Sequence, residues 1–594
     1  MALIPTRPTP VDTKPYLSVA LARSTRMIDD AELLGQLVAE AEAWIEARGK
    51  RTGEEMFQPE ISEGGAALQA FAYLFSKQAA WASEAAFTDT THELLVIAVK
   101  DTKVAVCCTE AGVRDGLVNN LAGLVRFTRS EVEQTFVGKQ AKALWLKGIH
   151  TPTAAKADAK ALLGRALELA IDPLGDQSYF YSAVKSHVPF GGAESLIGTA
   201  PGSARVWIGR KSWTDFAVAL NNIFDALAAP AGGAPHGWLD ILATESGSID
   251  DAGALYAIAI VPPELLGDVE IDAADREKAI AWAYAATFDI LETDDPHPVV
   301  AVALDGTGLG TLRLDFGNEA SAIKAEATWL EEGPGSDVDR AACKQMLEDT
   351  RYLRAYFEGA TLAEGRLFNP AYRDEKFAWE FADFTGYAIT DEKPARWGNH
   401  SLAALIAEKK ENGDDDDSLF AYVVEKLFPK GWLASDDGAM EFADFVHIDP
   451  ESHRVTLIHA KGSNKDNPGR GVSVSSYEVV VGQAVKNVRY LDRDNLARIL
   501  ENGVNKAIAG AVWFDGARQD DRAGIIAMAN QLKPDHEKVV MVLQPQLTRS
   551  ERDACDGGIG GPRGARMRQL HTLMLAAELS CRAVGARLVS IGSE

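Results

Sequence analysis

The segments FADFVHI (442–448) and HRVTLIHAK (453–461) decide the fold of the C-terminal third of the chain. Both are short and rich in apolar and β-branched residues, which is typical of strands. We therefore expect two successive strands, which can pair within one sheet. If they pair, polar side chains near their ends can meet at one site.

Helical and strand patterns surround these two segments. SLFAYVVEKLF (418–428) predicts a helix with Ser418 as its N-cap, and SVSSYEVVVGQAVKNVRYL (473–491) predicts a second helix. Further along, KVVMVLQPQL (538–547) predicts a strand, and residues 566–583 predict a helix that leads into a terminal strand. A strand–helix–strand unit of this kind predicts an α/β domain.

Acidic, basic and amide side chains occur in a recognisable order on these elements. The first helix carries Glu425, the next strand Asp444, the strand after it ends at Lys461, and the following helix carries Gln483. This order resembles the PD-(D/E)XK, restriction-endonuclease-like superfamily. The resemblance implies that Asp444 is the main metal ligand and Lys461 the motif lysine, with Glu425 as the helix acid. Glu441 is an alternative second acid.

The resemblance covers about residues 415–500 and implies a metal-dependent nuclease. Hydrolysis of a phosphodiester needs a hard divalent cation held by carboxylates, which makes Mg²⁺ or Mn²⁺ the expected cofactor. The cation stabilises charge at the phosphate and acidifies the attacking water. A nearby lysine can orient that water or neutralise developing charge.

One position departs from the family pattern. His459 stands two residues before Lys461, where the family usually has Asp or Glu. Histidine ligates divalent metals, although transition metals suit it better than magnesium. Three interpretations stay open: the site uses manganese through His459, it takes its second acid from Glu425 or Glu441, or it is inactive.

The same residues also fit a rival motif. His459, Lys461 and Asp466 match the HxKxxxxD pattern of the phospholipase D superfamily, in which the histidine is the nucleophile and the lysine binds phosphate. That mechanism needs two such motifs, and the only other H-x-K, at 536–538, lacks the aspartate. This interpretation therefore requires a homodimer.

Several basic residues are candidates for nucleic-acid binding. Backbone amides of the Gly-rich segment 555–564, at the start of a predicted helix, could hold phosphate, and nearby arginines could assist. The candidate side chains are Lys465, Arg470, Lys486, Arg563, Arg566 and Arg568.

The acidic run EKKENGDDDD (408–417) is the clearest boundary, because runs of like charge usually mark solvated linkers. We expect an α/β or α+β domain at 1–190, a mixed recognition or assembly domain at 191–407, and the nuclease-like domain at 418–594. No motif in the first 400 residues attaches to a chemistry.

Composition narrows the class of protein. The net charge of −26 argues against coating nucleic acid through bulk positive charge. The five cysteines form no CxxC pair, and neither a signal peptide nor an apolar run long enough for a transmembrane helix occurs, so we expect a cytoplasmic protein without a membrane partner.

The sequence therefore predicts a multi-domain α/β protein that cleaves DNA, in preference to RNA. A large recognition part ahead of a nuclease-like domain is similar to bacterial defence effectors against phage or plasmids. The alternative is a scaffold subunit with a degenerate nuclease-like domain. It would bind a partner such as a helicase or an ATPase, and a homo-oligomer is also expected.

Overall fold

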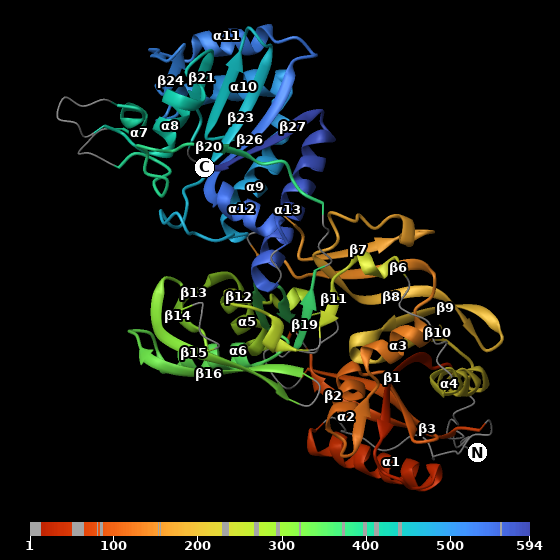
Figure 1. Ribbon diagram of the computed structural model, residues 1–594. Coiled ribbons are helices and arrows are strands. Elements are labelled where there is room, and N and C mark those ends of the chain that lie inside the picture. Colours follow the sequence, from red (N-terminus) through yellow and green to blue (C-terminus); the bar gives the residue numbers. More distant parts are fainter. Residues whose placement is uncertain are drawn as a thin grey trace.

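The protein is a mixed α/β structure, with 33% helix and 36% strand, and the residues described form four sheets (Figure 1). This confirms the predicted fold class. The computed structural model describes residues 13–49, 65–79, 81–82, 87–152, 154, 156–228, 237–246, 248–266, 273–292, 297–319, 322–370, 375–395, 401–408, 415–437, 442–558 and 561–594.

The first sheet is antiparallel and takes in strands from the first 210 residues. Its order is β2-β3-β4-β1-β10-β9-β8-β6-β7, and β5 pairs with β1. The strands are β1 (Tyr16–Ser24), β2 (Ala67–Gln78), β3 (Thr88–Lys100), β4 (Lys103–Cys108), β5 (Leu124–Arg126), β6 (Gln140–Gly148), β7 (Ala159–Leu163), β8 (Tyr179–Phe190), β9 (Ala193–Ala200) and β10 (Arg205–Arg210).

Helices cover both faces of this sheet. Apolar side chains of α1 (Asp30–Ala47) and α2 (Ala111–Asn120) pack on one face, and those of α3 (Arg129–Phe136) and α4 (Trp213–Ala228) pack on the other. The hairpin of β8 and β9 crosses the expected border at residue 190, so the sheet continues beyond it.

Two smaller antiparallel sheets share one core in the middle of the chain. The first has the order β11-β19-β18-β17-β12 and the second the order β13-β14-β15-β16. Their elements are β11 (Thr244–Ser246), β12 (Leu255–Ile260), α5 (Ala273–Ala285), β13 (Ala286–Glu292), β14 (Val299–Leu304), β15 (Thr307–Glu319), β16 (Ala322–Glu332), α6 (Asp337–Glu348), β17 (Leu353–Phe357), β18 (Thr361–Ala363) and β19 (Arg366–Asn369).

The C-terminal sheet is mixed and has the order β20-β27-β26-β23-β22-β21-β24-β25. The strands from β20 to β23 run parallel, and the pairs from β23 to β25 are antiparallel. The strands are β20 (Glu380–Ala382), β21 (Trp432–Ser435), β22 (Phe445–Asp449), β23 (Arg454–Ala460), β24 (Val512–Phe514), β25 (Ala517–Arg518), β26 (Glu537–Thr548) and β27 (Ala586–Ser593).

Apolar cores lie on both faces of the C-terminal sheet. One face packs against α9 (Ser475–Asn487), α10 (Arg493–Asn502), α11 (Ala523–Gln531), α12 (Arg549–Asp556) and α13 (Gly561–Arg582). The other packs against α7 (Leu402–Leu405), α8 (Leu419–Tyr422) and a π-helical turn, Val423–Leu427. None of the helices in the described ranges is long and apolar enough to cross a membrane.

Most elements predicted around 418–491 are present. The Ser418 hydroxyl accepts a hydrogen bond from the Ala421 N–H, as the predicted N-cap requires. The strand expected at 442–448 begins only at Phe445, and it is preceded by a separate strand, β21, that was not predicted. β21 pairs with the neighbouring β22 and also with β24, which is distant in sequence and which local composition does not reveal.

The C-terminal sheet begins ahead of the expected acidic linker. β20 pairs in parallel with β27, and the side chains of Phe377 and Trp379 are buried in the core of this unit. At the described end of the acidic run, Asp416 is buried and accepts hydrogen bonds from the Ala407 and Ser418 amides. This residue is therefore part of the packed unit rather than of a solvated linker.

A buried ion pair fixes the turn that follows β21. The Arg522 side chain is fully buried, and its Nη1 lies 3.1 Å from Asp436 Oδ1, while its Nη2 donates to the Ser435 carbonyl. Lys506 Nζ lies 2.7 Å from the other Asp436 oxygen. A Cβ at Gly503 would collide with the guanidinium, so this position requires glycine.

We expect Asp436→Ala to lower the free energy of unfolding by about 3–5 kcal/mol, because it leaves the Arg522 charge buried without a carboxylate partner. Urea unfolding at neutral pH measures the change. The matched control is Arg582→Ala, which removes an exposed ion pair with Glu578 and should cost about 0–1 kcal/mol. Equal losses in the two variants would contradict the prediction.

Candidate functional site

Asp444 and Lys461 lie at the same end of two paired strands. Asp444 directly precedes β22 and Lys461 directly follows β23, and the antiparallel register sets Phe445 opposite Ile458. The Asp444 N–H donates to the Ile458 carbonyl, and an Asp444 carboxylate oxygen accepts the Ala460 N–H at 2.8 Å. The two predicted site residues are therefore brought to the same end of this strand pair.

An alternating chain of charges extends from Lys461. Its ammonium lies 2.8 Å from the Glu392 carboxylate, and Lys393 lies 3.2 Å from Glu392 and 2.8 Å from Asp437. Burial opposes the charge on Lys393, but the Asp437 and Glu392 carboxylates outweigh it and raise the pKa of Lys393. Asp437 is buried, while the Lys461 side chain is 50% exposed, so the chain of charges ends at the surface.

Backbone hydrogen bonds place Glu392 beside Lys461. The carbonyls of Asp391 and Glu392 accept the N–H groups of Leu419 and Phe420, the first residues of α8. Close by, the Ile389 carbonyl accepts the Ser463 N–H from the loop after β23. Sequence reasoning missed Glu392 because it comes from a segment far ahead of the motif.

Two glutamines at the end of β26 hold the loop that follows Lys461. Gln546 Oε1 accepts from the Ser463 hydroxyl at 2.8 Å and from the Asn464 N–H at 3.2 Å. Gln544 Nε2 donates to the Gly462 carbonyl. Both side chains are buried, so the loop starts from a fixed position. The polar QPQ sequence within an apolar strand was the signal that could have identified them.

His459 does not lie at the surface of this site. Its side chain is 2% exposed, and its Nε2 has no hydrogen-bond partner in the described part of the chain. Burial lowers the pKa of His459 to about 4, so the ring is neutral at pH 7. His459 is therefore an uncharged, inward-facing group two residues before Lys461.

The remaining predicted site residues are dispersed or lie outside the described residues. Glu425 accepts a hydrogen bond from the Tyr387 hydroxyl at 2.7 Å, and Gln483 is half-buried on α9. Glu441 lies outside the described residues. Among those described, no three His, Cys, Asp or Glu side chains gather so that they could hold a metal ion. The described side chains thus do not by themselves fit Mg²⁺ or Mn²⁺.

Three of the predicted nucleic-acid-binding residues have partners within the protein. Arg470 is buried and donates to the Pro545 carbonyl, Arg563 pairs with Glu551, and Arg566 pairs with Glu358. Their charges serve internal contacts in this structure.

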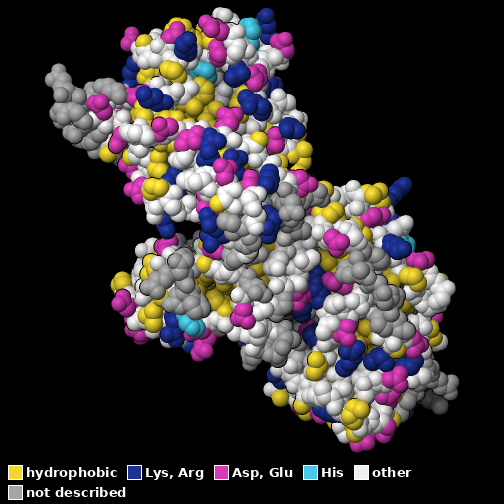
Figure 2. All heavy atoms as spheres, viewed as in Figure 1, with side chains coloured by type: hydrophobic (Ala, Val, Ile, Leu, Met, Phe, Trp, Pro, Cys, Tyr) yellow, Lys and Arg dark blue, Asp and Glu magenta, His cyan; other side chains and the backbone are white. Residues whose placement is uncertain are grey.

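The other three have different surroundings. Lys465 and Lys486 are exposed, and Arg568 is half-buried. On the face shown in Figure 2, Lys and Arg side chains are interspersed with Asp and Glu over the C-terminal part. This mixed surface agrees with the sequence argument against bulk electrostatic coating of nucleic acid.

The phospholipase D interpretation finds no support in this geometry. A nucleophilic histidine must reach a phosphate, but His459 is enclosed in the sheet while Asp466 is exposed on the following loop. Lys461 contacts Glu392. The three residues of the motif thus have separate environments.

Comparison of the chain with models of known protein families, with curated proteins and with solved structures finds no match.

We expect acid to destabilise the protein partly through His459. The unfolded ring takes up a proton near pH 6.5, whereas the folded ring does so only near pH 4. Between these values the unfolded chain binds the extra proton, so stability falls as the pH falls, by up to about 3 kcal/mol. Urea unfolding near pH 7 and near pH 4.5 should show a smaller acid loss in His459→Leu.

The matched control is His453→Asn, which removes an exposed histidine ahead of the same strand. Its backbone has a φ of 51°, a conformation that asparagine tolerates. An acid loss in His459→Leu as large as that of the control would contradict the role given to the buried ring.

Proposed function

We propose that the C-terminal unit hydrolyses phosphodiester bonds of DNA, with Asp444 and Lys461 carrying the reaction. The observation that supports this is the pairing of β22 with β23, which delivers a carboxylate and an amine to one end of the sheet. A carboxylate can orient a water for attack, and an ammonium can stabilise charge on the phosphate.

The contacts of Lys461 suit such a role. Its partner Glu392 is 19% exposed and Lys461 itself 50% exposed, so water screens the pair. Exposed ion pairs are worth about 0–1 kcal/mol. A phosphate group could therefore replace Glu392 on Lys461 at little cost. Asp444, by contrast, is held by the Ala460 N–H and keeps its position.

A second candidate function has its own observation. His459 is buried at the position where the related pattern has an acid, and it is neutral at pH 7. This favours a binding subunit whose nuclease-like domain has lost its activity. It would act through a partner such as a helicase or ATPase. Dependence on Mg²⁺ or Mn²⁺ stays a prediction for the nuclease alone, and a role in defence and self-association stay predictions as well.

We expect Asp444→Asn and Lys461→Met each to lower the rate of DNA cleavage at least about 100-fold, because the first removes the carboxylate that orients the water and the second the ammonium that stabilises charge on the phosphate. The assay uses purified full-length protein with plasmid, linear and single-stranded DNA, in Mg²⁺ or Mn²⁺. EDTA serves as the metal control. Circular dichroism checks that each variant is folded.

The matched control variant is Lys533→Ala, an exposed lysine ahead of β26, at the opposite end of the sheet from Lys461. Its cleavage rate should stay within about threefold of the parent, as is typical of a surface change. Equal cutting by all variants would refute the assignment of the centre. Absence of cleavage by the parent protein in every metal would favour the binding subunit.

A further inference from the structure

Helices cover one face of the N-terminal sheet along its whole width only in part. α3 and α4 pack on one face of β8 to β10, whereas α1 and α2 cover the opposite face along β1 to β4, away from β6 to β9 (Figure 1). Exposure alternates along β8: Val184 and Ser186 are buried, and Lys185 between them is partly exposed. Between β10 and β7, the face opposite α3 and α4 is therefore accessible to solvent.

Two neighbouring rows of side chains cross this accessible area, which we call the open face. The strand register, from β10 through β9, β8 and β6 to β7, gives the first row as Trp207, Gly198, Lys185, Ala143 and Leu163. Continuing that register gives the second row as Arg205, Ala200, Ala183, Trp145 and Ala161. Alternate residues of a strand share one face, so these side chains lie together. The two rows contain a lysine and an arginine but no carboxylate.

Two tryptophans project from the open face, and small residues surround them. A Cβ at Gly198 would lie 2.0 Å from Cε2 of the Trp207 indole, so this ring lies across β9 and the position requires glycine. The ring centroids of Trp145 and Trp207 are 6.2 Å apart, with an angle of 65° between the rings. Trp145 is 37% exposed. The pair thus presents aromatic surface to solvent on an otherwise low sheet.

Positive charge accompanies the tryptophans. The Arg205 guanidinium lies 5.4 Å from the Trp207 ring centroid, and its Nε donates to the Ser18 hydroxyl at 3.0 Å. Lys185 lies in the same row as Trp207 and forms no ion pair with any described residue. Its ammonium is therefore available to an anion that approaches the open face.

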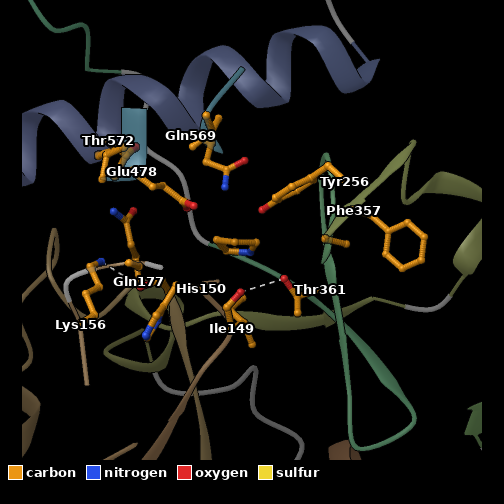
Figure 3. A pocket seen from close by; sticks show the side chains of 16 residues that line it. Ile149, His150, Lys156, Gln177, Tyr256, Phe357, Thr361, Glu478, Gln569 and Thr572 are labelled. Atoms are coloured by element: carbon orange, nitrogen blue, oxygen red, sulfur yellow. Dashed lines mark hydrogen bonds between the residues drawn. The ribbon is translucent and has the colours of Figure 1, made fainter. Parts of the chain in front are cut away.

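Buried hydrogen bonds connect the open face to the rest of the chain. Just beyond β6, which carries Trp145, the Ile149 carbonyl accepts the Thr361 hydroxyl at 2.9 Å (Figure 3). The Thr151 hydroxyl donates to Glu478 on α9 at 2.6 Å. These bonds join β6 to the middle part and to the C-terminal unit. A molecule held on the open face would therefore stay attached to the unit that carries the proposed nuclease centre.

The chemistry of the open face favours a single-stranded nucleic acid. Unpaired bases have free faces that stack on aromatic side chains, whereas the bases of a duplex are already stacked on one another. The phosphates of the strand carry the negative charge that complements Lys185 and Arg205. A neutral glycan or an apolar peptide would leave these two cations without an opposite charge.

We propose that the open face binds single-stranded DNA. Bases would stack on Trp145 and Trp207, and Lys185 and Arg205 would contact the phosphates beside them. The choice of DNA over RNA rests on the proposed function, whereas binding itself needs neither cleavage nor the residues of the nuclease centre. The open face would hold a strand close to the unit that cuts it.

Fluorescence anisotropy with a labelled oligothymidine of about 12 nucleotides tests this on full-length protein. All variants carry Asp444→Asn and are measured in EDTA, so binding is read independently of any cleavage. We expect Trp145→Ala to weaken binding about 10-fold, as loss of one stacked base does, and Trp145→Phe to restore most of it. Lys185→Gln should weaken binding and lower the slope of log affinity against log salt concentration by about 0.7.

The matched control is Trp81→Ala, which removes a 75% exposed tryptophan that follows β2, at the opposite edge of the sheet from β7. Its binding should stay unchanged. Circular dichroism checks that each variant is folded, and Lys185→Gln decides the test if Trp145→Ala unfolds.

Absence of saturable binding up to about 100 μM protein would overturn the proposal. Equal affinity of the Trp145→Ala and Trp81→Ala variants would do the same, because the strand would then bind elsewhere. A duplex that binds more tightly than the single strand would contradict the stacking argument. Tighter binding of oligouridine than of oligothymidine would overturn the choice of DNA.

Discussion

The register of β22 on β23 is the constraint on which the C-terminal site depends. Phe445 pairs with Ile458, and continuing the register places Asp444 beside the last residues of β23. A slip of one residue would turn every side chain to the opposite face. Alternating residues of β23 enter two different apolar cores, Val455 and Leu457 on one face and Ile458 and Ala460 on the other. Both cores therefore oppose such a slip, and the strand ends stay aligned.

Local sequence patterns predicted the elements around this constraint but not their long-range partners. The apolar run at 453–461 predicts β23 because composition and flanking turns suffice for a buried strand. The short strand β20 escapes such reasoning, since its pairing with β27 joins segments about two hundred residues apart. Asp444 and Lys461 lie on successive strands, so their approach could be predicted. Glu392, which contacts Lys461, comes from a distant segment and was not predicted.

Charged residues were harder to interpret from sequence, because their availability depends on tertiary contacts. Arg470, Arg563 and Lys465 look alike as basic residues in polar, Gly-containing segments. In the structure Arg470 donates to the Pro545 carbonyl, Arg563 pairs with Glu551, and Lys465 is exposed. Sequence shows the charge, but the fold decides whether a ligand can use it.

A buried ion pair and a partly exposed ion pair lie close together at the end of the C-terminal sheet. They differ in how much it costs to break them. The Asp436–Arg522 pair is completely buried. Breaking it would leave a buried charge without its opposite charge, so the pair fixes the turn after β21. The Asp436 N–H in turn donates to the Asp444 carbonyl, which carries this rigidity to the site. The exposed pair of Lys461 with Glu392 can exchange partners cheaply. The proposed centre, which would hold Asp444 still and free Lys461 to meet a phosphate, would need both kinds of pair.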